Sequence, residues 1–197
     1  MVKNLTENKK ELIRKASINI IAEYGFYNTK MSQIAEEAEV AVGTIYNYFN
    51  NKEKILEYIF EVEVEKRLKY LNMKEKSDKK FWTKMEEFLN KHFQDLKKNI
   101  NTAKILVREK EFPRKNDSGA IVEYRYKIPE KFKELMDNDI NQNQIKKCNT
   151  EIISSIIFGA IQRIVEKAVN EGNYEILEQA PAELMKTLKN GLQQYSK

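Results

Sequence analysis

Apolar residues recur every three or four positions along most of the chain, the spacing that places them on one face of an α-helix. A clear short example is the segment 31–38, whose apolar positions are Met31, Ile34, Ala35 and Ala38. Glycine and proline are rare, at six and three residues, and no convincing strand pair or hairpin turn interrupts the pattern. The sequence therefore predicts an all-α protein.

The same periodicity predicts nine helices. The first covers residues 7–24, with Thr6 as its N-cap and Gly25 as its C-terminal stop. The other predicted ranges are 31–38, 42–48, 51–76, 79–98, 101–111, 120–142, 148–171 and 175–195. Residues 112–119, FPRKNDSG, form the clearest loop, and Pro129 and Pro181 are expected at helix starts or kinks. We expect residues 1–50 to form a small head and residues 51–197 a larger helical body.

Composition removes several classes of function. The chain has one cysteine, Cys148, and one histidine, His92, so an intrachain disulfide and most zinc or histidine-based catalytic sites are excluded. We find no nucleophile–base pair, phosphate-binding loop or dinucleotide-binding glycines, and therefore predict no enzyme activity, catalytic residue, metal or cofactor. The longest nearly apolar run, residues 152–161, is about half of what a membrane span needs, and the N-terminus lacks a signal-peptide core. A cytoplasmic protein with no membrane partner is expected.

The net charge of +5 suggests nucleic-acid binding only weakly, because of where the charge lies. Residues 1–55 hold eight Lys or Arg and seven Asp or Glu, a difference of +1. If this region binds DNA, it does so through geometry and a few placed groups rather than through bulk charge.

The predicted third helix divides its side chains sharply between two faces. At about 100° per residue, Ile45 and Phe49 point inward with Val42 beside them. The outward strip is small at its centre and rich in hydroxyl groups at its edges; it comprises Gly43, Thr44, Tyr46, Asn47 and Tyr48. Such a strip can enter a DNA major groove, where the amide meets base edges and the hydroxyls reach phosphates. Clustered aromatic residues are more often core, and that reading holds for Phe49.

The stretch GFYNTKMSQIAEEAEVAVGTIYNYFNNKEKIL, residues 25–56, resembles the N-terminal signature of the TetR family of bacterial transcriptional repressors. The matching positions are Gly25, Thr29, Ile34, Ala35, Ala38, Val40, Gly43, Thr44, Ile45, Tyr46, Tyr48, Phe49, Lys52 and Leu56. The resemblance implies a three-helix DNA-binding head and a body that dimerises and holds a ligand pocket. It also implies DNA contacts from the start of the second helix and from Thr29, Val42, Gly43, Thr44, Tyr46, Asn47, Tyr48 and Lys52, with Lys52 meeting a phosphate.

One position departs from that signature. Between the second and third helices such proteins usually read Ala-Gly-Val, whereas this chain reads Ala38-Glu39-Val40. If the backbone keeps a positive φ there, glutamate should cost about 1 kcal/mol relative to glycine.

Two C-terminal segments carry apolar stripes suited to pairing with a second copy. In the resembled family the last two helices form a four-helix bundle with their copies, which implies a homodimer. The corresponding interface residues are Ile153, Ile156, Gly159, Ala160, Leu184 and Leu188. The alternative is that both stripes are ordinary core of a monomer.

The body also supplies candidates for an apolar, elongated effector pocket: Phe60, Trp82, Phe88, His92, Arg108, Phe112 and Phe158. The aromatic residues are equally consistent with core, His92 with a buried structural histidine, and Arg108 with a salt bridge. The motifs KHFQDL and IIFGAI are similar to those of fatty-acid degradation repressors that respond to long-chain acyl-CoA. That resemblance makes acyl-CoA the first candidate effector, with Arg108 and Arg114 expected at the pocket mouth.

The leading hypothesis is a dimeric, ligand-responsive repressor that binds a pseudo-palindromic double-stranded DNA operator. The alternative is a helical interaction protein that keeps the head but acts through protein partners.

Overall fold

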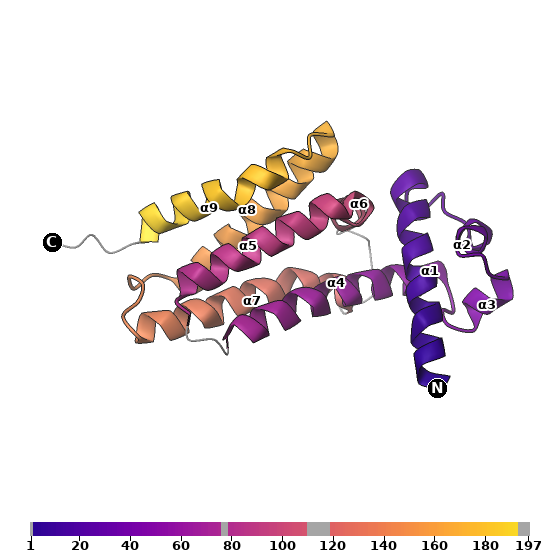
Figure 1. Cartoon of the computed structure of the whole chain (residues 1–197), viewed down its shortest axis with the longest axis horizontal. Coiled ribbons are helices and arrows are strands. Elements are labelled where there is room, and N and C mark those ends of the chain that lie inside the picture. Colours follow the sequence, from indigo (N-terminus) through magenta and orange to yellow (C-terminus); the bar gives the residue numbers. More distant parts are fainter. Residues whose placement is uncertain (1, 76–78, 110–118, 193–197) are drawn as a thin grey trace.

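The computed structural model describes residues 2–75, 79–109 and 119–192, which form nine α-helices and no strand (Figure 1). The helices are α1 (Val2–Tyr24), α2 (Met31–Glu37), α3 (Val42–Tyr46), α4 (Lys52–Glu75), α5 (Phe81–Lys98), α6 (Ile100–Arg108), α7 (Ala120–Asn141), α8 (Thr150–Glu171) and α9 (Ile176–Leu192). The predicted all-α fold is confirmed, and helix ends differ from the predicted ones by a few residues at most, apart from the start of α1.

Of three local predictions, the N-cap was wrong, the prolines occupy one of their two expected kinds of position, and the loop is largely untested. Because α1 begins at Val2, Thr6 lies inside the helix and is not its N-cap. Pro129 and Pro181 lie within α7 and α9 rather than at their starts. The predicted loop at 112–119 lies outside the described residues except for Gly119, which precedes α7 with a φ of 111°.

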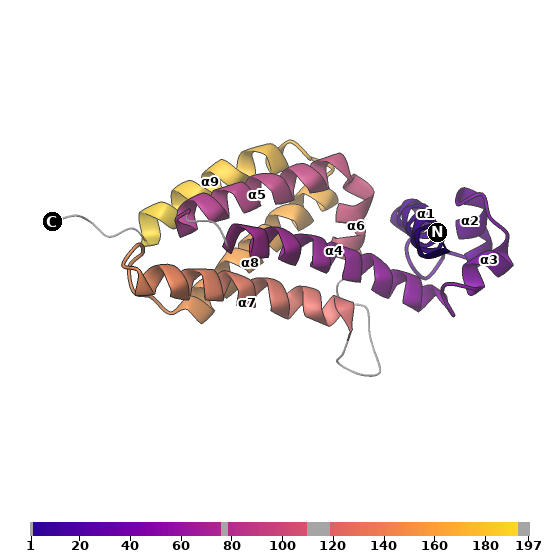
Figure 2. The ribbon, with the colours of Figure 1, turned by 60° about the horizontal axis from the view of Figure 1, so that its bottom comes forward.

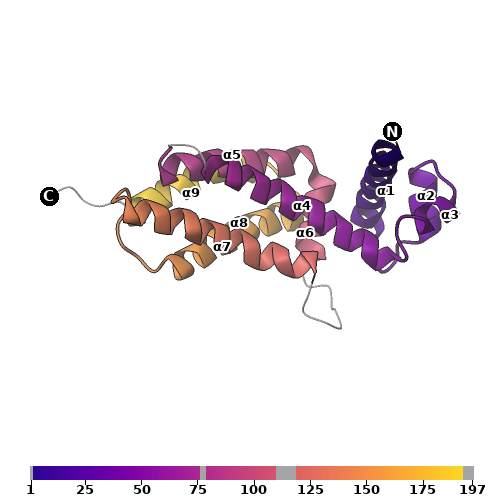
Figure 3. The same ribbon diagram turned by 90° about the horizontal axis from the view of Figure 1, so that it is seen from below.

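The head and the body lie at opposite ends of an elongated molecule (Figures 1 and 2). Helices α1 to α3 form the head, and α4 runs from the head deep into the body, where it packs along α7. Helix α5 packs along α9, and α8 contacts α6, α7 and α9 (Figure 3). Helix α6 lies between α1 and α8, so it joins the head to the C-terminal helices.

Burial follows the apolar periodicity. The buried apolar residues form one cluster that runs from Ile13 and Ile45 in the head to Phe60, Phe93 and Phe132 in the body. The short helices α2 and α3 are too short to be stable alone in water, so their order depends on this packing. The core thereby holds α3 in a defined orientation.

Candidate nucleic-acid interface and interior cavity

The turn between α2 and α3 closes as a Schellman motif. The Val40 amide donates to the Ala35 carbonyl at 2.9 Å, and the Glu39 amide donates to the Glu36 carbonyl at 3.0 Å. Glu39 occupies the left-handed position of this motif with a φ of 53°. The predicted positive φ is confirmed, so Glu39 carries the backbone strain that glycine would avoid.

The exposed face of α3 matches the predicted division of its side chains. Ile45 and Phe49 are buried. The predicted outward residues keep accessible surface: Gly43, Tyr46 and Asn47 are exposed, and Thr44 and Tyr48 are half-buried. Val42, expected beside the inward pair, is exposed instead. Tyr46 and Asn47 project from a strip whose centre, Gly43, allows a close approach of another backbone. These residues are available to a duplex, and their contacts with DNA stay a prediction.

Lys52 does not face outward as expected for a phosphate contact. Its ammonium donates to the backbone carbonyls of Phe26, Tyr27 and Thr29 at 2.5, 3.2 and 2.8 Å. It also lies 4.6 Å from the centre of the Phe26 ring. Because an ammonium has three donors, these carbonyls account for all of them. Lys52 therefore joins the start of α4 to the turn between α1 and α2. In this conformation its ammonium is not free to meet a phosphate, and the predicted contact stays a prediction.

Thr29 also has a structural position rather than an outward one. Its side chain is buried, and its hydroxyl donates to the Gly25 carbonyl at 2.8 Å. The side chain is not accessible to a duplex in this conformation, and the predicted DNA contact of Thr29 stays a prediction. The residues that lead into α2 and remain exposed are Tyr27, Asn28 and Lys30, which sequence reasoning did not single out.

Helix α1 is bonded to the body by α6. Arg108 donates to the Ala22 carbonyl at 3.1 Å, and Asn101 donates to the Asn19 side chain at 3.1 Å. The carboxylate of Glu109, immediately after α6, accepts from the backbone amide of Phe26 at 3.4 Å. A displacement of α6 would therefore strain or break its hydrogen bonds with the C-terminal half of α1.

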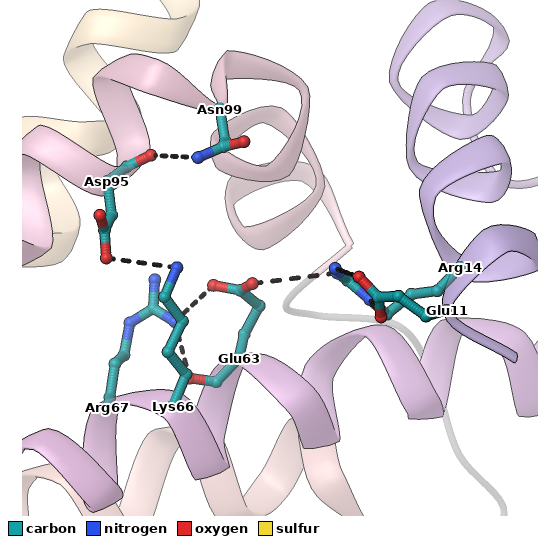
Figure 4. Close-up of polar contacts among 7 residues, drawn as sticks. All are labelled: Glu11, Arg14, Glu63, Lys66, Arg67, Asp95 and Asn99. Atoms are coloured by element: carbon teal, nitrogen blue, oxygen red, sulfur yellow. Dashed lines mark hydrogen bonds and ion pairs between the residues drawn. The ribbon is translucent and has the colours of Figure 1, made fainter. Parts of the chain in front are cut away.

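A buried polar chain links α1 to the middle of the body through α4 (Figure 4). Glu63 lies between two guanidinium groups, Arg14 of α1 at 4.0 Å and Arg67 of α4 at 2.6 Å. Arg67 in turn donates from Nε to Nδ1 of His92 on α5 at 3.1 Å. The i, i+4 spacing of Glu63 and Arg67 is a helical ion-pair signal that could have been read from the sequence.

His92 is the inner end of this chain. It is 6% exposed and stacks on Phe88, with ring centres 5.6 Å apart. Burial lowers the pKa of His92 well below its usual value of 6.5, and the charges of Arg67 and Lys66 lower it further. The ring is therefore neutral, and since Nδ1 accepts a hydrogen bond, its proton lies on Nε2. Within the described residues, Nε2 is buried without a hydrogen-bond partner.

Two small cavities adjoin His92. The first, about 80 Å³, lies between α4 and α5 and is lined by Lys66, Arg67, Tyr70, Phe88, Lys91, His92 and Asp95. The second, about 10 Å³, lies among α5, α6, α7 and α8 and is lined chiefly by apolar residues, with Tyr124 and Gln162. The second is about the size of one water molecule. Neither cavity has room for a long acyl chain in this conformation.

The predicted pocket residues separate into two groups. Phe60 and Phe158 both pack against Tyr124, with ring centres 5.9 and 5.8 Å away, and Arg67 connects Tyr124 to His92. Phe88 stacks on His92. Trp82 instead packs against Phe81 at the start of α5.

The predicted mouth residues do not adjoin the cavities. Arg108 is bonded to α1 and lines neither cavity in this closed conformation, so its place at a pocket mouth stays a prediction. Phe112 and Arg114 lie outside the described residues.

The predicted dimer residues remain accessible in the single chain. Ile156 is 56% exposed, as is Ile152, which sequence reasoning missed. The other predicted residues are exposed or half-buried: Ile153, Gly159, Ala160, Leu184 and Leu188. A Cβ placed on Gly159 would meet no atom within 4 Å, so packing inside this chain does not require a glycine there.

Among the described residues, no helix is long and apolar enough to cross a bilayer, and no group of three or more metal-ligating side chains is present.

Comparisons with known proteins identify the head. The sequence model of the bacterial regulatory proteins of the tetR family matches residues 13–59, from within α1 into α4. The structure of the transcriptional regulator FadR from Bacillus subtilis in complex with stearoyl-CoA is similar over 90% of this chain and 96% of its own, with 26% identity and a TM-score of 0.82. The head therefore matches the TetR family model, and the whole chain shares the fold of the FadR regulator. These similar proteins are transcriptional regulators.

Other similar structures agree with this assignment of the TetR fold. The fatty acid degradation regulator FadR from Bacillus halodurans covers 95% of this chain and 97% of its own, with 25% identity and a TM-score of 0.84. A TetR transcription regulator from Haloarcula marismortui has the same fold at 16% identity and a TM-score of 0.80. A comparison with curated protein sequences gave no match.

Proposed function

We propose that this protein is a dimeric repressor of the TetR family that binds a pseudo-palindromic operator and is released by an amphipathic effector. Long-chain acyl-CoA is the first candidate effector. The observation that carries the proposal is the face of α3, where Tyr46 and Asn47 are exposed above a core anchored by Ile45 and Phe49.

The DNA-binding part of the proposal rests on α3 and its surroundings. A recognition element must present polar groups to base edges while its other face is held rigidly. Tyr46 and Asn47 meet the first requirement, and the burial of Ile45 and Phe49 meets the second. We propose DNA contacts from the outward residues of α3, with residues 1–50 as the DNA-binding domain and 51–197 as the effector-binding and dimerisation domain.

Dimerisation is supported by the apolar surface of α8 and α9. Ile152 and Ile156 are more than half exposed one helical turn apart, and Gly159 continues the same face with open space in front of it. A single helix-turn-helix head is a weak binder, whereas a two-fold pair reads two half-sites about 34–36 Å apart. We propose that a second copy covers this face.

The proposed effector class follows from the interior and from the FadR relatives. One of those relatives was solved with stearoyl-CoA. In the present chain, Phe60 and Phe158 pack against Tyr124 and Phe88 stacks on His92, in a core with two small cavities next to His92. Side chains must move apart to admit a ligand, so we assign this closed body to the effector-free, DNA-binding state.

Release of DNA requires that a structural change in the body reach the head. Two sets of contacts connect α1 to the body. One is the polar chain from His92 through Arg67 and Glu63 to Arg14, and the other is the contact of α6 with α1. An effector that prefers an opened body by about 2–3 kcal/mol would weaken operator binding roughly 30- to 150-fold.

Selection of duplexes from a random pool, followed by affinity measurement at moderate salt, tests DNA recognition. The wild type should prefer the selected pseudo-palindrome over a scrambled duplex, and Asn47→Ala should lose about 1–3 kcal/mol of that preference. Asn72→Ala, an exposed asparagine on α4 far from the head, is the matched control. Equal affinity for selected and scrambled duplexes would reject the repressor assignment and favour a protein-interaction role.

Titration of acyl-CoAs of increasing chain length into the protein–operator complex tests the effector class. Release that grows with chain length supports the proposal, because each buried methylene adds about 0.8 kcal/mol. Failure of every acyl-CoA below its micelle concentration would exclude this class while leaving operator binding intact.

A further inference from the structure

The buried N–H of His92 is a hydrogen-bond donor that the folded chain leaves without an acceptor. Arg67 occupies the Nδ1 side of the ring, and Nε2 has no partner within the described residues. A buried donor without an acceptor costs about 1–3 kcal/mol, so such groups are rare unless they serve a ligand or a water. His92 lines both of the small cavities, which are the spaces next to this residue through which an acceptor can reach it.

The surroundings of His92 change from charged to apolar across the ring. On the α4–α5 side, the cavity of about 80 Å³ is bordered by the ammonium groups of Lys66 and Lys91, which are about half exposed. Both ammonium groups bind the same carboxylate, Asp95, at 3.2 and 2.9 Å. One carboxylate cannot neutralise two ammonium groups, so this opening keeps a positive charge.

On the other side of His92 the lining is almost entirely aliphatic. Leu96, Leu106, Val107, Ile161 and Val165 surround the small cavity. The order from the surface inward is therefore two lysines, one uncharged hydrogen-bond donor, and an apolar interior. An amphiphile with an anionic head, a carbonyl group and a hydrocarbon chain has its groups in the same order.

We propose that His92 Nε2–H is the anchor for the carbonyl oxygen of an acyl thioester or ester, with Lys66 and Lys91 binding its anionic head and the aliphatic side receiving its chain. This inference rests on the proposed effector function and specifies the site. Because His92 also accepts from Arg67, a ligand that pulls the ring toward its carbonyl weakens the Arg67–His92 bond. The resulting shift of Arg67 acts on Glu63, which holds Arg14 of the head.

The decisive experiment removes the carbonyl from the ligand instead of changing the protein. Palmitoyl-CoA and its thioether analogue S-hexadecyl-CoA have matched chains and heads, and only the first has a thioester oxygen. In calorimetric titrations of the full chain below micelle concentration, we expect the thioether to bind about 5- to 10-fold more weakly, as for one buried hydrogen bond. With His92→Phe, which keeps the stacked ring, the difference should shrink to less than about 2-fold.

A second pair of probes tests the lysines. Lys66→Ala and Lys91→Ala should each weaken palmitoyl-CoA severalfold and leave the uncharged thioester S-palmitoyl-N-acetylcysteamine unchanged. Lys69→Ala, a lysine on α4 that does not line the first cavity, is the control.

The outcomes separate this inference from the function on which it rests. If wild-type protein binds the thioester and thioether equally, the carbonyl anchor is overturned and the effector class stands. If neither ligand binds while operator DNA does, both the anchor and the effector class fall and the DNA-binding function remains. The ligand comparison holds even if His92→Phe fails to fold, because it uses the wild-type chain.

Discussion

Arg67 donates a hydrogen bond from Nε to Nδ1 of His92 at 3.1 Å, joining α4 to α5 inside the body. The bond fixes the neutral tautomer of the chain's single histidine and places it at the end of an ion-pair series that reaches α1. This relationship couples the stability of the body to proton uptake at one residue.

The first prediction is a loss of stability below about pH 6.5 that comes from His92. Burial lowers the pKa of His92, so in this range the unfolded chain binds a proton that the folded chain excludes. The free energy of unfolding should therefore fall on acidification, by up to about 1.4 kcal/mol per pH unit. Urea unfolding between pH 5 and pH 8 measures this slope. His92→Gln, which keeps an acceptor for Arg67, should abolish it; an unchanged slope would show that other groups are responsible.

The second prediction concerns Lys52. Replacing it with methionine should lower the free energy of unfolding by about 1–3 kcal/mol, because three backbone carbonyls lose a charged donor. Lys54→Met, at an exposed lysine two residues away that pairs only with Glu57, should change stability by less than about 0.5 kcal/mol. Thermal unfolding compares the two. If both variants were equally stable and only the Lys52 variant bound DNA more weakly, the result would contradict this structural role and support a phosphate contact by Lys52.

The third prediction is that Glu39→Gly stabilises the head by about 1 kcal/mol, because glycine adopts a positive φ without a side-chain clash. Asn143, the other described non-glycine residue with a positive φ, at 56°, provides the comparison. Asparagine tolerates this conformation better than glutamate, so Asn143→Gly should give a smaller gain. Chemical unfolding of both variants measures the difference. A loss of stability in Glu39→Gly would show that the Glu39 side chain makes a compensating contact.

The fourth prediction is that Ile156→Glu yields a folded monomer. Ile156 is 56% exposed in the single chain, so the charge stays in water in the monomer but would be buried in the proposed interface, at a cost of several kcal/mol. Met73→Glu, at an equally accessible apolar residue on α4, should remain dimeric. Light scattering gives the mass, and circular dichroism confirms folding. A monomeric wild type at micromolar concentration would contradict the proposed interface.

Local periodicity was sufficient to predict the helices and the division of α3 into faces. Ile45 lies in α3 and Phe49 three residues after its end, and both are buried as their i, i+4 spacing predicts, because a helix this short must pack to be stable. The αL turn at Glu39 was also readable, because its place between two helices is set by short-range geometry.

The direction of long polar side chains was not predictable in the same way. Lys52 points toward carbonyls about 25 residues earlier in the chain, and His92 meets Arg67, also 25 residues earlier. These contacts depend on how helices are placed in space, which a one-dimensional pattern does not encode. The interior volume was unpredictable for a related reason: Phe88 and Phe158 look the same in sequence whether they line an open pocket or fill a closed one.

The inward orientation of Lys52 has a consequence for how the protein searches a genome. Residues 31–51, which hold α2, the turn and α3, contain no lysine or arginine and three glutamates, Glu36, Glu37 and Glu39. With Lys52 bound internally, few cations displace counterions from the duplex, and each missing phosphate contact removes about 0.9 from the slope of log K against log salt. The affinity of the protein for random duplex should therefore be low. Even at a low copy number, most molecules would then be free to find the operator, because few would be bound to non-specific chromosomal DNA.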